Sequence, residues 1–387
     1  MSICLLEALY PRKNQTMTIL FEELNNEQRI EMMRHNHVEW GGKLDFKEYC
    51  KRESFCHQFL ETRAFGLLSN GKLVASLESY IRKGVFNEEE EDIYSIATVY
   101  VPKEHRRNGF ASVLFEELTT LMDKSDIKSV LFSDVKHFYN RFEYKTFEGE
   151  ACVLDPKISE NPISYLQLGD LPQISKLNEM VYNQLKKSGN ILYVIDDANV
   201  FQFPYSRELF YRCNSLNPNC TIEEMNATWH NNTMNKTLKR ASSSSSGESL
   251  FNHDLVQFPS AQKPLAVNLN IGAFIEKEDG SYGYILWTAI VHKKKYTDNI
   301  PISEIQEHRH LTVISLQVFS KSAEAKQRLE IELLQCAQQY AYEDRLDKVV
   351  MWSFEFPHLQ NTKLEDCWPA MRPKDMAWKN MMRYTWC

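Results

Sequence analysis

The chain has 387 residues, of which 43% are hydrophobic and 25% charged, and its net charge is −7. This length suits two domains, and the composition is that of a soluble globular protein. The acidic excess disfavours a broad nucleic-acid-binding surface, and no apolar run approaches the roughly 20 residues that a membrane span needs.

The first 155 residues have the alternating pattern of an α+β unit. The hairpin signal Asn70-Gly71 joins two β-prone runs. The expected elements, in chain order, are a strand over 18–22, helices over 26–35 and 45–56 with N-caps at Asn26 and Asp45, strands over 64–69 and 72–82, an acidic loop over 86–92, a strand over 93–101, a helix over 110–122, a strand over 128–134, and a strand over 147–154 that closes the sheet.

The segment from Val99 to Ala111 has the most specific pattern. A β-prone run breaks at Pro102, a basic loop follows, and Gly109 opens an apolar-periodic helix. Amides at a helix N-terminus have no partner within the helix, and the helix dipole favours an anion there. This segment therefore predicts a phosphate-binding loop, although strand-to-helix loops with Arg and Gly also occur without a ligand.

The spacing Arg106-x-x-Gly109-x-Ala111 resembles the coenzyme A loop of the GCN5-related N-acetyltransferases (GNAT), whose signature is Gln/Arg-x-x-Gly-x-Gly/Ala. The segment from Phe138 to Tyr144 is similar to the family's Phe-Tyr-x-x-x-Gly-Phe segment, with Glu143 in the place of glycine. The resemblance implies an N-terminal acetyltransferase domain over residues 1–155, with acetyl-CoA as co-substrate. The positions that it implies for coenzyme binding are Val99, Tyr100, Val101, Arg106, Arg107, Asn108, Gly109, Phe110 and Ala111.

The second half repeats the order hairpin, strand, helix, strand. The expected elements are a strand over 163–168, helices over 170–187 and 200–213, a hairpin over 271–276 and 282–291, a strand over 311–319, a helix over 323–342 and a strand over 348–356. We therefore expect an internal duplication, with tandem GNAT-like lobes and mixed sheets, although any α+β domain could show this order.

The second lobe, over residues 160–387, is expected to be degenerate. Its strand-to-helix turn, SKSAEAK at 320–326, has no glycine and should not hold a pyrophosphate. Residues 214–263 are polar and low in complexity, so we expect a disordered insertion there.

Three residues are candidates for the chemistry of acyl transfer. The resemblance implies that Tyr139 is the general acid near the thioester sulfur, and the alternative is a core aromatic side chain. Glu78 lies on a predicted strand and could act as the base from the cleft, or could be a solvated carboxylate. The terminal carboxylate of Cys387 is a further candidate base, since the C-terminal stretch WKNMMRYTWC is apolar enough to dock against the first lobe.

The domain layout is similar to that of the fungal lysine N6-acetyltransferase family, which implies acetylation of free L-lysine or a similar small amine. A protein or peptide N-acetyltransferase and a non-catalytic acyl-CoA-binding or protein-interaction module stay open as alternatives. We expect a small-molecule amine as partner, with neither nucleic acid nor membrane.

Cysteine and histidine usage indicates the compartment and speaks against a metal site. Nine cysteines occur without a Cys-x-x-Cys pair, as in intracellular proteins with reduced thiols. The first residues carry Glu7 and too short an apolar core for a signal peptide. We expect a cytoplasmic location, with the nucleus possible, and no metal, because His35, His37 and His57 lack ligand spacing.

Overall fold

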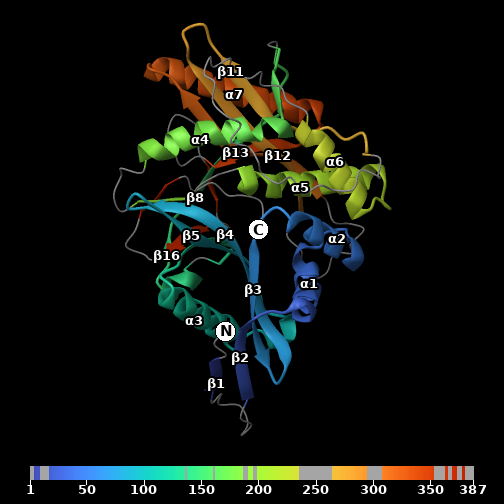
Figure 1. The fold of residues 1–387 in the computed structure, drawn as a ribbon, viewed down its shortest axis with the longest axis vertical. Coiled ribbons are helices and arrows are strands. Elements are labelled where there is room, and N and C mark those ends of the chain that lie inside the picture. The colour runs from blue at the N-terminus through green and yellow to red at the C-terminus, as the bar shows by residue number, and fades with distance from the viewer. Residues whose placement is uncertain are drawn as a thin grey trace, which may run out of the picture.

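The computed structural model describes residues 4–8, 17–135, 137–159, 162–185, 191–194, 198–234, 264–293, 307–352, 362–364, 368–372 and 377–379. Two mixed β-sheets, of ten and seven strands, form the centres of two lobes (Figure 1). This arrangement confirms the α+β class. Within these residues, no helix is both long and apolar enough to cross a membrane.

The first sheet runs antiparallel through its first five strands and then turns parallel. Its N-terminal strands are β1 (Cys4–Ala8), β2 (Met17–Glu23), β3 (Thr62–Ser69), β4 (Lys72–Phe86), β5 (Glu89–Tyr100) and β6 (Lys128–Ser133). Strands β5 and β6 are parallel, and the helix α3 (Phe110–Lys124) connects them. A parallel pair needs such a crossover, and here the crossover begins at the predicted phosphate-binding loop.

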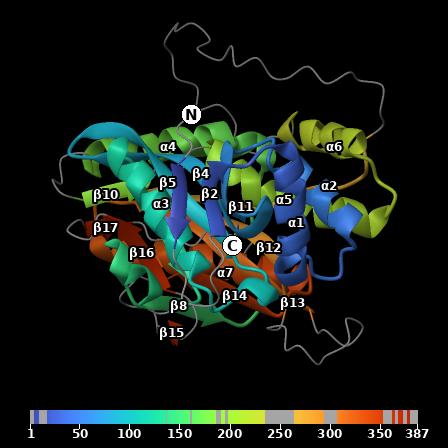
Figure 2. The ribbon, with the colours of Figure 1, turned by 90° about the horizontal axis from the view of Figure 1, so that it is seen from below.

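Helices cover both faces of this sheet (Figure 2). On one face, α3 buries Leu114, Phe115 and Leu118 against strand residues such as Phe65 and Leu77. On the other face, α1 (Asn26–Trp40) places Met32 in a cluster with strand residues. The helix α2 (Phe46–Cys56) follows it and packs on α5 (Ala198–Leu216) of the second lobe.

Most predicted elements of the first lobe are confirmed, with two local corrections. Asn70 and Gly71 form the predicted turn, with φ values of 50° and 79°. The N-cap of α1 is Asn25 and not Asn26, because the Asn25 side chain accepts from the amides of the first turn.

The acidic segment predicted as a loop over 86–92 is a second hairpin. Asn87 and Glu88 form its turn with φ values of 49° and 69°, and β4 and β5 pair up to Phe86 and Glu89. Charged residues are tolerated in these strands because they are partly exposed and paired, as in the 2.6 Å ion pair of Lys83 with Asp92.

The second sheet repeats the strand and helix order of the first. Its strands are β8 (Gly149–Leu154), β9 (Tyr165–Gln167), β11 (Asn270–Glu276), β12 (Tyr282–Lys293), β13 (Glu307–Phe319), β14 (Lys348–Trp352) and β15 (Thr362–Leu364). The hairpin β11–β12, the strand β13, the helix α7 (Ala323–Glu343) and the parallel strand β14 follow one another as β3–β4, β5, α3 and β6 do. This repetition supports the expected internal duplication.

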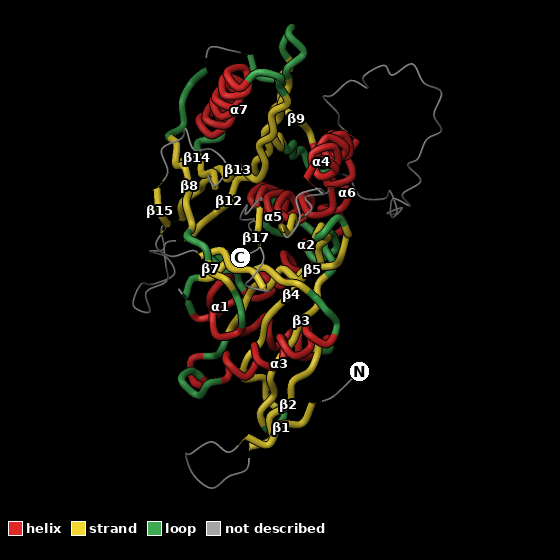
Figure 3. Tube along the Cα trace, turned by 90° about the vertical axis from the view of Figure 1, so that its left-hand side faces the viewer, coloured by secondary structure: helices red, strands yellow, loops and turns green. Residues whose placement is uncertain are grey.

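Helices also cover both faces of the second sheet (Figure 3). The helix α7 packs on one face. The helices α4 (Leu171–Leu185), α5 (Ala198–Leu216) and α6 (Ile222–Met234) contribute to a cluster on the other face, and that cluster continues into α2. Because of this continuity, α5 lies between the second sheet and the first lobe.

The two sheets exchange strands, which the sequence did not lead us to expect. The strand β8 was predicted to close the first sheet, but it pairs with β14 and β15 of the second. In return, β16 (Trp368–Arg372) pairs with β6 and with β7 (Lys145–Thr146) of the first sheet. The strands β10 (Ile191–Val194) and β17 (Ala377–Lys379) extend the first sheet beside β4. The boundary near residue 155 therefore does not separate the two sheets.

The prediction of disorder over 214–263 is wrong for its first part. The helix α6 buries Met225 and Trp229, with exposed fractions of 0% and 8%. The Asn232 side chain accepts from the amide of Leu269 at 2.9 Å and donates to the carbonyl of Val267 at 2.7 Å. Apolar residues at helical spacing anchor this segment despite its polar composition. Residues 235–263 lie outside the described residues.

Candidate active site

A β-bulge separates the ends of β5 and β6 and opens a cavity. Parallel pairing ends at Ile96 and Leu131, although β5 continues to Tyr100. On the other side of β5, Ser76 pairs with Tyr100 and Glu78 with Ala97, so β5 carries the extra residue. A cavity of about 1680 Å³ lies at the splayed ends, and residues 96–101 and 131–135 line it.

The predicted phosphate-binding loop forms one wall of this cavity. Lys103–His105 form a short 3₁₀ turn, Arg107 takes a φ of 65°, and Gly109 takes a φ of 80° as the N-cap of α3. The Arg106 guanidinium donates through Nε to the Val101 carbonyl at 3.0 Å and lies 5.5 Å from the centre of the Tyr100 ring. These contacts fix a basic side chain beside the helix N-terminus, where anions are favoured.

Eight of the nine positions expected to bind the coenzyme line this one cavity. They are Val99, Tyr100, Val101, Arg106, Arg107, Gly109, Phe110 and Ala111. Asn108 is not among the lining residues: its side chain donates to the His105 carbonyl at 3.1 Å and braces the loop from within. The uncapped start of α3 and the two arginines suit a diphosphate. The edge of β5 beyond Ile96, which does not pair with β6, suits an extended arm.

The corresponding turn of the second lobe is built differently. Ser322 caps α7, and its hydroxyl accepts from the Ala325 amide at 3.4 Å. At α3 the N-cap is Gly109, which has no side chain to occupy that position. The Ala325 amide of α7 is therefore engaged by a side chain, whereas the first turn of α3 has no side-chain cap and its residues Phe110 and Ala111 line the cavity.

Tyr139 lines the cavity and also belongs to the core. Its side chain is 9% exposed, and its ring centre lies 4.8 Å from that of Phe115. Glu143, where the family has glycine, takes a φ of 64°, so a residue with a side chain holds a conformation that glycine favours. Tyr144 replaces phenylalanine, and its hydroxyl pairs with that of Ser129 at 2.7 Å, where burial raises its pKa.

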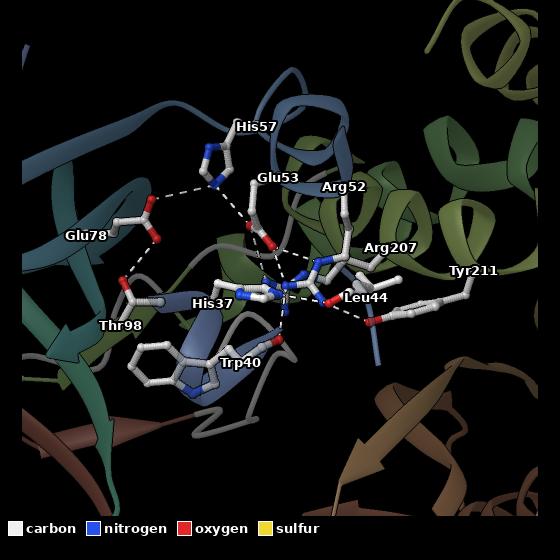
Figure 4. Close-up of polar contacts among 10 residues, drawn as sticks. All are labelled: His37, Trp40, Leu44, Arg52, Glu53, His57, Glu78, Thr98, Arg207 and Tyr211. Atoms are coloured by element: carbon white, nitrogen blue, oxygen red, sulfur yellow. Dashed lines mark hydrogen bonds and ion pairs between the residues drawn. The ribbon is translucent and has the colours of Figure 1, made fainter. Parts of the chain in front are cut away.

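Glu78 is buried and lies behind the cavity wall rather than in it. Its carboxylate is 5% exposed and accepts a hydrogen bond from the Thr98 hydroxyl at 2.9 Å (Figure 4). Thr98 lines the cavity and Glu78 does not. The interpretation of Glu78 as a solvated strand carboxylate is therefore wrong. Between the Glu78 carboxylate and the cavity lies the Thr98 hydroxyl group.

A buried polar cluster, which sequence reasoning missed, continues from Glu78 across α2 to α5 (Figure 4). The Arg52 guanidinium binds the Glu53 carboxylate through Nε at 2.7 Å and donates to the Tyr211 hydroxyl at 2.8 Å. Arg207 lies 3.6 Å from Glu53. Burial alone would raise the pKa of Glu53, but the charges of Arg52 and Arg207 outweigh it and lower that pKa to about 2.

Charged side chains of the second lobe complete the cavity wall. Arg207, Glu208, Tyr211 and Arg212 of α5 all line it. Arg212 binds Glu208 at 2.8 Å and Asp344 at 2.7 Å, so the wall carries both signs of charge in a fixed arrangement. A single helix from the second lobe thus presents guanidinium, carboxylate and phenol groups to the site.

Two predictions concern Cys387 and the absence of a metal site. Cys387 lies outside the described residues, so its terminal carboxylate stays a prediction. Over the described ranges, no group of three His, Cys, Asp or Glu side chains is arranged to hold a metal ion.

Comparison with known proteins agrees with this geometry. Residues 39–147 match the family model for an acetyltransferase (GNAT) domain. A lysine acetyltransferase of Yarrowia lipolytica is 30% identical over 28% of this chain and 35% of its own length. The chain therefore spans about a third of that curated relative.

Two solved structures are similar over most of the chain. One is a probable N-acyltransferase from Enterococcus faecalis, with 12% identity, a TM-score of 0.47, and coverage of 92% of this chain and 73% of its own. The other is a GCN5-related N-acetyltransferase from Kribbella flavida, with 11% identity, a TM-score of 0.48, and coverage of 92% and 71%.

The cavity, its loop and the family match coincide in one region, because residues 39–147 include β5, the loop, α3 and Tyr139. Members of this family use acyl-CoA and amine substrates. Residues 39–147 of this chain are thus matched to an acetyltransferase (GNAT) domain.

Proposed function

We propose that the protein transfers an acetyl group from acetyl-CoA to the amine of a small acceptor, with free L-lysine as the first candidate. One observation carries this proposal: a single cavity joins the basic loop and Tyr139 of the first lobe to the charged face of α5 in the second. The name of the Yarrowia lipolytica relative, a lysine acetyltransferase, supports the choice of lysine.

The loop residues have a binding role in this proposal. Amides at the start of α3, with Arg106 and Arg107 beside them, hold the diphosphate, and the backbone of Val99–Val101 binds the extended arm. Acetyl-CoA supplies the thioester when bound. Holding it against β5 fixes the acyl group at the splayed strand ends, which gives the reaction its orientation.

Two side chains have a proton-transfer role. The Tyr139 hydroxyl, at the cavity wall, gives a proton to the departing sulfur. Glu78 is the base, and it receives the proton of the acceptor amine by way of the Thr98 hydroxyl. Because Glu78 is 5% exposed, bulk water does not compete for this position.

The charges on the far wall favour an amino acid over a peptide. Arg207 and Arg212 contribute cations, and Glu208 and Asp344 contribute carboxylates, all around one cavity. A free amino acid carries a carboxylate and an ammonium group, so it can use both signs, whereas a residue within a peptide carries neither on its backbone. The two functional lobes follow the two sheets, so β8 belongs to the second lobe and β10, β16 and β17 belong to the first. We place this protein in the cytoplasm.

Thiol release tests the proposal directly. Purified protein is mixed with acetyl-CoA and, in turn, L-lysine, other free amino acids, small diamines and a lysine-containing peptide, and the products are identified by mass spectrometry. The proposal predicts release with L-lysine or another small amine. Release with the peptide alone would favour a protein acetyltransferase, and binding of acetyl-CoA without release in any arm would favour a non-catalytic module.

A further inference from the structure

Thr98 occupies a strained position between the cavity and a buried carboxylate. Its φ is 50°, a left-handed conformation that β-branched residues rarely adopt. Such a conformation is unfavourable and persists only where the surrounding structure enforces it. Here the bulge places Thr98 in the cavity wall, with its hydroxyl donating to Glu78 at 2.9 Å.

The other oxygen of Glu78 faces His57, the residue that caps the C-terminus of α2. His57 Nε2 lies 3.8 Å from Glu78 Oε1 and 3.5 Å from Glu53 Oε2 (Figure 4). This nitrogen is buried and makes no hydrogen bond with any described residue. A buried polar atom without a hydrogen-bond partner is destabilising, and in native proteins such an atom calls for a specific explanation.

Packing fixes the imidazole in this place. The ring stacks on Phe203 at 6.3 Å and meets Tyr80 edge-on at 6.2 Å. About a fifth of the side chain, 21%, is exposed, and since Nε2 is buried, the exposed part belongs to its other atoms. His57 thus has one nitrogen turned inward to two carboxylates and another part of the side chain in contact with solvent.

We propose that Thr98, Glu78 and His57 form a path that carries the proton of the acceptor amine out of the cavity. This inference rests on the proposed function. The ammonium gives a proton to Thr98 Oγ1 while the hydroxyl proton passes to Glu78, which leaves a neutral amine and a carboxylic acid. The proton arrives on Oε2 of Glu78, and rotation of the carboxyl group turns it towards His57. Glu78 then gives this proton to His57 Nε2, which restores the carboxylate, and the imidazolium releases a proton to water.

The distances allow this path with small adjustments. The gap of 3.8 Å between Glu78 and His57 exceeds a hydrogen bond by less than about 1 Å, so a modest turn of either side chain closes it. His57 acts through Glu78 and is a relay residue, because it does not line the cavity.

Charged groups of both signs surround His57. Glu53 and Arg52 lie on α2, Glu78 and Tyr80 on β4, and Arg207 on α5. Because its two arginines keep Glu53 ionised, Glu53 accepts no proton here. It supplies a fixed negative charge 3.5 Å from the imidazole nitrogen.

Two pairs of variants separate a proton path from a structural role. Thr98→Ser keeps the hydroxyl, whereas Thr98→Val keeps the shape and removes it. We expect turnover within about twofold of wild type for T98S and a loss of about 10²-fold for T98V. His57→Gln keeps a polar group but cannot relay a proton, and we expect about tenfold slower turnover, a displaced acidic limb of the pH–rate profile and partial rescue by added imidazole.

The acetyl-CoA affinity of each variant, measured by calorimetry, is expected to equal that of wild type and controls for folding. Equal rates for T98S and T98V, or an H57Q enzyme with the wild-type pH profile and no imidazole rescue, would overturn the path. A second readout needs no acceptor: the NMR resonances of the His57 imidazole should respond to Glu78→Gln in the free protein. If no amine is acetylated but this response is seen, the proposed function fails while the coupling stands; if the resonances do not respond, the path fails.

Discussion

Replacing Glu53 with Gln is expected to destabilise the protein by about 3 kcal/mol at neutral pH. The arginines at Glu53 lower its pKa from 4.5 to about 2, and a pKa difference of this size corresponds to about 3 kcal/mol. Removing one partner of a buried ion pair costs a similar amount, about 3–5 kcal/mol, because Arg52 and Arg207 lose the carboxylate that they share.

The sign of the pH dependence follows from the direction of the pKa change. Because folding lowers the pKa of Glu53, its contribution is complete above about pH 4.5 and is lost as the pH falls towards 2. Urea unfolding at a series of pH values measures this directly. Between pH 4.5 and pH 2, the free energy of unfolding of wild type should fall to that of E53Q. The control Glu116→Gln lies at an exposed position of α3, and its free energy of unfolding should stay within about 0.5 kcal/mol of wild type. Equal stability of E53Q and wild type at pH 7 would refute the reasoning.

Three further substitutions test the site and the fold. Tyr139→Phe keeps the packing and should slow turnover about 10²-fold at unchanged acetyl-CoA affinity; unchanged turnover would remove the acid role. Gly109→Ala forces a side chain into a left-handed conformation at a cost of roughly 1–2 kcal/mol, so calorimetry should show roughly tenfold weaker acetyl-CoA binding. Gly71→Ala, with a φ of 79° in a distant hairpin, is its control and should bind normally. Trp229→Ala removes a ring 4.3 Å from that of Phe59 and should cost about 3–5 kcal/mol in urea unfolding, whereas exposed Asn231→Ala should cost little; equal effects would contradict a packed α6.

Features set by local chemistry were predictable from the sequence. Asn70-Gly71 takes the turn that its residue types favour, and Gly109 takes the left-handed conformation expected at the start of the predicted helix. The eight positions that line the cavity follow from the same local pattern, because strand, loop and helix are contiguous in the chain.

Features set by distant pairing were not predictable. The composition of β8 does not say which sheet it joins, since its partners β14 and β15 lie about two hundred residues away. The acidic run ending at Asp92 resembled a loop because charge is common in loops, yet pairing with Lys83 and exposure let it form a strand. In α6, the composition of the surrounding stretch masked a short apolar face.

The relay residues lacked a sequence signal for the same reason. Thr98 acquires its conformation from a bulge defined by pairing with β4, and His57 meets Glu78 only when α2 packs on the sheet. Neither residue belongs to a motif. Their juxtaposition is a tertiary property, which a pattern of residue types cannot reveal.

Amide hydrogen exchange with and without acetyl-CoA tests most directly whether the loop after Pro102 holds the coenzyme. The account predicts that acetyl-CoA protects the amides of residues 106–112 and of Val99–Val101, while the capped turn at 320–325 of the second lobe exchanges unchanged. Protection at the second turn alone, or no protection at either, would contradict it.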